Sequence, residues 1–140
     1  NRHTQVAAAS LIKNSIIHIL EPNEFNYVVR EERIITYNNL NRKDFLSLLG
    51  SMDINLYCSF SESWGQVVIE SLALNTPCIY SNNSGISKFI NSNQCLINEF
   101  DNVVAIANKI ESLLKSNNLE FDLNYFKQQV KQLNLKLVEI

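Results

Sequence analysis

The chain has 140 residues, of which 46% are hydrophobic and 19% charged, and a formal net charge of -2. This composition is typical of one globular domain with its own core, and the absence of a basic excess excludes nucleic acid as an expected partner. No run approaches the ~20 apolar residues of a membrane span, so we expect a cytoplasmic protein, with peripheral membrane attachment as the alternative.

Helices and strands are predicted to alternate from the start of the chain. The expected elements of the first part are a helix over residues 4–14, a strand over 15–20, a short element at 27–29, a strand over 33–37, and a helix that Asn41 caps and that runs to Ser51. Capping is expected because an asparagine side chain accepts hydrogen bonds from the first helical amides.

The alternation continues to the end of the chain. We expect a strand over residues 54–58, a helix over 66–74, a strand over 78–80, a short helix over 86–90, a short strand over 95–97, a helix capped by Asp101 that runs to Leu114, and a last helix over 121–133. This order predicts an α/β fold with a Rossmann-like, doubly wound parallel sheet covered on both faces.

Cysteine and histidine usage favours structural roles. Cys58, Cys78 and Cys95 are odd in number and form no close pair, so we interpret them as small core residues in a reducing environment. His3 lies near one end of the chain and His18 lies in an apolar strand. No spacing typical of metal ligands is present, and we predict neither a metal site nor a cofactor.

The segment from Glu62 to Glu70 carries the main functional signal. A glycine, Gly65, lies between two carboxylates that are eight positions apart, at the start of a predicted helix. The first amides of a helix lack internal partners and attract phosphate groups. Glu70 would lie roughly 7 Å further along the helix, which is about the reach from a diphosphate to a ribose, and a carboxylate suits a vicinal diol. Glu62 falls after a strand, where ligands of open α/β sheets collect.

The alternative is that both acids face solvent, as most charged residues do. The predicted helix is apolar on most sides, however, through Val67, Val68, Ile69, Leu72 and Leu74. Such a helix is expected to be largely buried. A buried Glu70 would then need a partner.

The segment from Ser59 to Gly85 resembles the donor-site signature of retaining glycosyltransferases with the GT-B fold, of the family 4 or group 1 type. In that pattern a glutamate is followed by a small residue, an aromatic residue, glycine and a second glutamate on a helix. A strand entered through proline and a glycine loop follow it. Here Trp64 takes the aromatic position, residues 76–79 the strand entry and residues 82–85 the loop.

The resemblance implies a role for each residue of this segment. Glu62 would be the catalytic residue, in contact with the transferred sugar near its reacting carbon, and Glu70 would bind the donor ribose. Backbone amides after the aromatic residue would hold the diphosphate. The substrate-binding residues implied are Ser63, Trp64, Gly65, Gln66, Val67, Glu70 and Arg2.

The resemblance also implies what the whole protein does. The chain would be a single domain over residues 1–140, the C-terminal half of a longer hexosyltransferase of polysaccharide biosynthesis, inactive when isolated. Its donor would be a UDP- or GDP-linked sugar, and its acceptor a glycan or lipid-linked saccharide bound by the other half. Residues 119–140 would cross back to that half, although an amphipathic last helix is first expected to pack locally.

The sequence departs from the family pattern at the expected diphosphate clamp. Arg2 is present near the start, but a lysine beside it is not, and Lys13 lies too deep in the predicted helix. Lys88 occupies a place where many relatives carry an acid. Two other functions therefore stay open: half of a sugar-nucleotide epimerase, and a degenerate, non-enzymatic interaction module.

Overall fold

The computed structural model describes residues 1–20, 25, 29–61, 64–90 and 93–138, with side chains through residue 132. Its first elements are α1 (Arg2–Ser10), β1 (Ile17–Leu20), η1 (Glu31–Arg33), β2 (Ile34–Tyr37), α2 (Arg42–Ser51) and β3 (Asn55–Tyr57). They are followed by α3 (Gln66–Ala73), β4 (Cys78–Ser81), η2 (Gly85–Lys88), β5 (Leu96–Ile97), α4 (Val103–Lys115) and α5 (Leu123–Val138). Of the short element expected at 27–29, residues 27 and 28 lie outside the described residues.

The strands in the described part of the chain are parallel and form two sheets. In the first sheet β1 pairs with β2, with Ile17 opposite Ile34. In the second the order is β3-β4-β5, with Asn55 opposite Cys78 and Tyr80 opposite Leu96. The predicted α/β class with parallel strands is confirmed. The strands are divided between two sheets, whereas the sequence indicated a single one.

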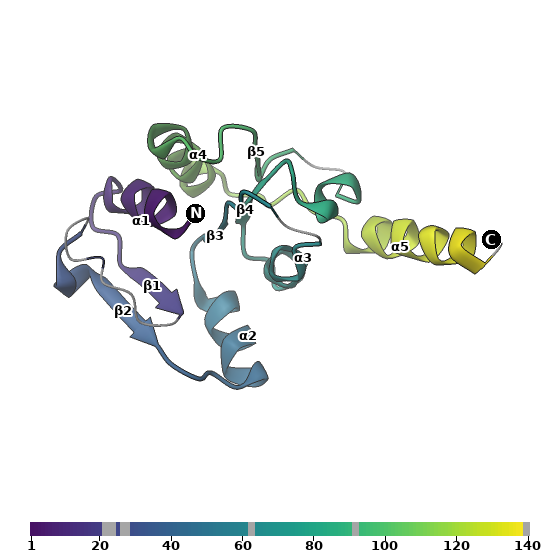
Figure 1. Ribbon diagram of the computed structural model, residues 1–140, viewed down its shortest axis with the longest axis horizontal. Coiled ribbons are helices and arrows are strands. Elements are labelled where there is room, and N and C mark those ends of the chain that lie inside the picture. The colour runs from purple at the N-terminus through teal and green to yellow at the C-terminus, as the bar shows by residue number, and fades with distance from the viewer. Residues whose placement is uncertain (21–24, 26–28, 62–63, 91–92, 139–140) are drawn as a thin grey trace.

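Helices cover the second sheet from both sides. Helix α1 packs against α4, and α2 packs against α3, with β3 to β5 between the two pairs (Figure 1). The larger core cluster lies around β4, whose four residues are all buried, and includes Val68, Leu72 and Ile106. A smaller cluster fills the space between α1 and the first sheet and consists of Val6, Ile17, Ile19, Phe25 and Val29.

Helix caps agree with the sequence at α2 and differ at α4. The Asn41 side chain accepts a hydrogen bond from the Asp44 amide at 2.9 Å, as predicted. At α4 the cap is Asn102, which accepts from the amides of Val104 and Ala105, so the prediction of Asp101 is wrong by one residue. Asparagine and aspartate are both competent caps, so residue type alone does not decide between the two positions.

Helix α1 ends at Ser10, four residues earlier than predicted. Asn14 adopts a left-handed conformation (φ 62°), which a helix interior does not accept. The Arg33 guanidinium donates hydrogen bonds to the carbonyl of Ser10 at the helix end, at 3.1 Å, and to those of Ile12 and Ser15 beyond it, both at 2.9 Å. A cation at a helix C-terminus is favourable because it satisfies carbonyls that lack helical partners.

Helix α5 begins later and runs further than predicted. Asp122 caps it by accepting hydrogen bonds from the amides of Asn124 and Tyr125. Phe126 packs on the larger core cluster, so the first turns of α5 are anchored locally. Beyond those turns the helix extends away from the sheets (Figure 1).

The three cysteines are reduced and buried, as predicted. Burial raises the pKa of the Cys58 thiol to about 12 and also raises the pKa of Cys78 and Cys95. Such thiols stay protonated at neutral pH and are poor nucleophiles. Their role is to fill the core beside β3, β4 and β5.

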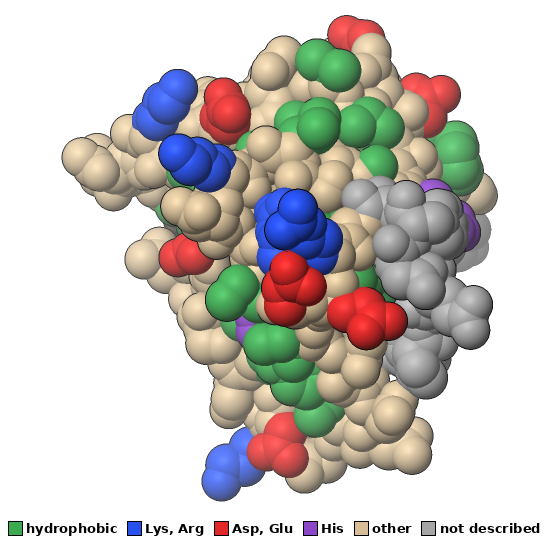
Figure 2. All heavy atoms as spheres, turned by 90° about the vertical axis from the view of Figure 1, so that its left-hand side faces the viewer, with side chains coloured by type: hydrophobic (Ala, Val, Ile, Leu, Met, Phe, Trp, Pro, Cys, Tyr) green, Lys and Arg blue, Asp and Glu red, His purple; other side chains and the backbone are tan. Residues whose placement is uncertain are grey.

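The outer face carries both signs of charge. Figure 2 shows Lys and Arg side chains next to Asp and Glu side chains on the side of the molecule that carries α1 and the first sheet. Arg30 and Glu32 form an ion pair at 3.9 Å, with both side chains largely exposed, and exposed pairs contribute little to stability. None of the helices in the described part of the chain combines the length and apolarity that crossing a membrane requires.

Candidate functional site

The carboxyl ends of β3 and β4 form the floor of the candidate site. The Ser59 amide donates to the Ser81 hydroxyl at 3.2 Å, and that hydroxyl donates to the Ser59 carbonyl at 2.9 Å. The Asn83 side chain donates to the Phe60 carbonyl. These bonds tie the loop after β3 to the loop after β4, at the edge of the sheet where parallel α/β folds bind ligands.

Helix α1 begins at the same edge. The Gln5 side chain accepts a hydrogen bond from the Cys58 amide at 3.0 Å, and the Asn1 side chain donates to the Phe100 carbonyl at 2.6 Å. Arg2, the first residue of α1, is exposed and lies next to this edge. The structure therefore brings Arg2 to the end of the sheet that the sequence indicated.

Gly65 turns the chain into α3. It has φ 90° and ψ 50°, a left-handed conformation that glycine adopts without strain. The Ile86 amide donates to the Trp64 carbonyl at 2.8 Å, which fixes the turn against η2. The first turn of α3 follows directly, with Gln66 exposed and Val67 half-buried. The predicted glycine-opened helix is thus present at the carboxyl end of β3.

The Trp64 side chain points into the protein. Its ring lies 5.1 Å from the ring of Phe89 and 6.5 Å from that of Phe126, measured between centroids. Both contacts are tilted, a geometry that aromatic pairs favour. The indole therefore anchors the turn against η2 and α5, and a contribution of Trp64 to a ligand would come from its backbone.

Glu70 is nearly buried and has a charged partner. Its side chain is 11% exposed, and its Oε1 atom accepts a hydrogen bond from Nη2 of Arg42, whose side chain is 59% exposed. This hydrogen bond, together with the negative charge of Glu70, raises the pKa of Arg42 above its usual value against the opposing effect of desolvation. The expected burial of Glu70 is confirmed, and so is its need for a partner.

Sequence reasoning missed Arg42. This residue opens α2 directly after the capping Asn41, 28 positions before Glu70. The ion pair forms because α2 packs against α3. The residues next to Arg42 and Glu70 in the sequence do not indicate that the two helices pack together.

Two of the predicted site residues, Glu62 and Ser63, lie outside the described residues. Lys13 lies in the turn that follows α1, on the surface, and Lys88 is exposed at the end of η2. The described residues hold no group of three or more His, Cys, Asp or Glu side chains placed to share a metal ion.

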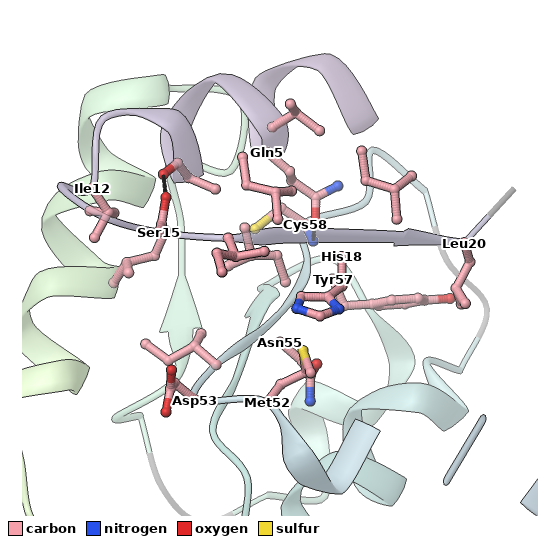
Figure 3. Close-up of a pocket in the computed structure, with 18 of the residues that line it drawn as sticks. Gln5, Ile12, Ser15, His18, Leu20, Met52, Asp53, Asn55, Tyr57 and Cys58 are labelled. Atoms are coloured by element: carbon pink, nitrogen blue, oxygen red, sulfur yellow. Dashed lines mark hydrogen bonds between the residues drawn. The ribbon is translucent and has the colours of Figure 1, made fainter. Parts of the chain in front are cut away.

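A cavity of about 900 Å³ lies between the two sheets, bounded by α1 and β1 on one side and by α2 and β3 on the other (Figure 3). Arg2 and Val67 are among its lining residues. On β1, His18 Nδ1 lies 2.8 Å from the Tyr37 hydroxyl, and the two rings stack. The walls are mostly apolar, whereas a diphosphate needs hydrogen-bond donors. The first turn of α3, next to Val67 of this lining, begins with backbone amides that lack helical partners.

Comparison with known proteins identifies the family. The sequence profile of the family described as glycosyl transferases group 1 matches residues 30–131, which are 102 of the 140 residues and include both α2 and α3. A search of the curated proteins finds no match. The matched region contains the glycine-opened helix, Glu70 and the loops that close the sheet edge, and the chain belongs to the group 1 glycosyl transferases.

Proposed function

We propose that this glycosyltransferase takes its sugar from a UDP- or GDP-linked donor and that the donor binds at the mouth of α3. The single observation that carries the proposal is Glu70, a nearly buried carboxylate one turn inside a glycine-opened helix of a group 1 family member. Burying a charged group is costly. A role in recognising a ligand explains why an acid is kept in this apolar helix.

The chemistry of a nucleotide sugar fits the two ends of this site. The amides of Gln66 and Val67 start α3 at its positive end, where a diphosphate is stabilised by hydrogen bonds and by the helix dipole. Glu70 lies further along the same helix, where its carboxylate would accept hydrogen bonds from the ribose diol. Arg2 would add a positive charge from α1.

The transfer itself would proceed with retention of configuration and without a divalent metal. The leaving diphosphate would be stabilised by helix amides, which are fixed before the reaction begins. Glu62 would stabilise the electron-poor sugar carbon. Titration of UDP or GDP in EDTA and in added magnesium or manganese checks the metal independence, and binding that EDTA abolishes and metal restores would contradict it.

The proposal extends to a GT-B architecture, in which a second α/β half binds a saccharide or lipid-linked acceptor. The site would then be completed in the cleft between halves. The length of α5 that extends away from the sheets is available for contact with such a half (Figure 1). A hexose donor and a role in polysaccharide biosynthesis belong to the same proposal.

The test is titration of UDP and GDP by calorimetry against the wild-type protein and Glu70→Ala. Loss of a charged hydrogen-bond partner typically costs ~1.5–3 kcal/mol, so the variant should bind roughly tenfold or more weakly. Glu111→Ala is the matched control, because Glu111 is an exposed acid on α4. Equal binding by wild type and Glu70→Ala would remove Glu70 from the ribose site.

A further inference from the structure

The Arg42–Glu70 pair is unequal in its exposure. The acid is 11% exposed and the guanidinium is 59% exposed. They are contributed by two helices that pack against each other, Arg42 by the first turn of α2 and Glu70 by the middle of α3. The guanidinium therefore lies on the solvent side of the pair, and the carboxylate lies beneath it between the two helices.

The contact between them uses one oxygen of the carboxylate. Nη2 of Arg42 donates to Oε1 of Glu70. A carboxylate has two oxygens and about four acceptor positions, so a single-point contact leaves capacity for a further donor at Oε2. Arginine is planar and always charged, and it holds a carboxylate in one orientation better than lysine does.

We propose that Arg42 is a positioning residue that holds the Glu70 carboxylate so that its second oxygen accepts a hydrogen bond from the donor ribose. This inference rests on the proposed function, because it assigns the support for the ribose contact. Arg42 acts through Glu70 and makes no contact with the ligand. Arg42 would fix one rotamer of the Glu70 side chain before the ligand binds, so that binding does not have to order it.

The test compares nucleotides with and without the ribose hydroxyls. Dissociation constants are measured for UDP and for 2′,3′-dideoxy-UDP, and for the corresponding guanosine nucleotides, with wild type, Arg42→Ala, Arg42→Lys, Glu70→Ala and the Arg42/Glu70 double alanine variant. Arg42→Ala should weaken binding of the ribonucleotide about three- to tenfold, within the range that coupled neighbours show. It should leave binding of the dideoxynucleotide unchanged. Arg42→Lys should restore part of the loss, and the double variant should bind no more weakly than Glu70→Ala.

Each other result overturns the inference. An equal loss with the dideoxynucleotide would mean that Arg42 contacts another part of the ligand or only supports the fold. An unchanged ribonucleotide affinity would mean that the ion pair is structural. Lys43→Ala is the matched control, since Lys43 is the next exposed cation on α2, and Arg42→Gln replaces Arg42→Ala if the latter fails to fold.

The two proposals fail in different ways. If the wild-type protein binds none of the nucleotides, the proposed function fails and this inference fails with it. If the wild-type protein binds and Glu70→Ala weakens binding while Arg42→Ala does not, only the inference fails.

Discussion

Replacement of Gly65 by alanine tests the turn on which the site is built. A residue with a β-carbon in the left-handed region destabilises the folded state by about 1–2 kcal/mol. Alanine also lowers the conformational entropy of the unfolded chain, which offsets about 0.4–1 kcal/mol of this loss. The new β-carbon would also lie 3.3 Å from Cγ2 of Ile86, which is fully buried and has little room to move. We therefore expect Gly65→Ala to destabilise the protein by about 1 kcal/mol, or roughly 3–5 °C in Tm.

Gly50→Ala is a control for which we expect stabilisation instead of destabilisation. It lies within α2, and a β-carbon there would meet Cδ1 of Leu74 at 3.5 Å, an ordinary contact. Gly50→Ala should therefore stabilise the protein by about 0.5–1 kcal/mol. Thermal and urea unfolding of both variants measure the two effects. A Gly65→Ala protein as stable as wild type, or one that follows Gly50→Ala, would refute the argument from backbone conformation.

Three further predictions concern a helix cap, a buried thiol and Glu62, the proposed catalytic residue. Asn102→Ala should cost about 1 kcal/mol of unfolding free energy, and Asp101→Ala should cost much less, as judged by urea unfolding. Burial raises the Cys58 pKa to about 12 from the ordinary 9.0. The contribution of Cys58 to stability should therefore be constant below pH 9 and fall as pH rises from 9 towards 12, because the unfolded chain loses the proton first. The urea midpoint of Cys58→Ala should fall less steeply with pH over this window than that of the wild type. In the two-half enzyme of the proposed function, Glu62→Gln should lower turnover about a hundredfold and change nucleotide affinity less than threefold, or ~0.7 kcal/mol. Full turnover of that variant in steady-state transfer would remove Glu62 from the mechanism.

The elements next to the site could be predicted from the sequence because their signals are local. Asn41 at the start of α2 and Gly65 before α3 are boundary residues that act within one turn of the helix they open. The burial of Glu70 followed from the apolar residues around it on α3. In each case the physical cause and its effect lie within about ten residues.

The remaining features depend on contacts between distant segments. Helix α1 ends early because Arg33, 23 positions beyond Ser10, hydrogen-bonds to the carbonyls at its end. Glu70 is paired because α2 packs on α3 and brings Arg42 to it. The division into two sheets likewise depends on how β1 and β3 are held apart, which strand patterns do not encode.

The missing lysine beside Arg2 bears on whether the site can hold a diphosphate at all. A sugar-linked diphosphate carries a negative charge on each phosphate. The N-termini of α1 and α3 both lie at the carboxyl end of the second sheet, and each helix supplies about half a positive charge. Together the two termini supply about one positive charge, and Arg2 lies beside them as the first residue of α1. Arg42 does not enter this sum, because its charge is matched by that of Glu70. We therefore expect the site to bind a nucleoside diphosphate without the lysine, and to depend on Arg2 more strongly than a site with a full Arg/Lys pair would.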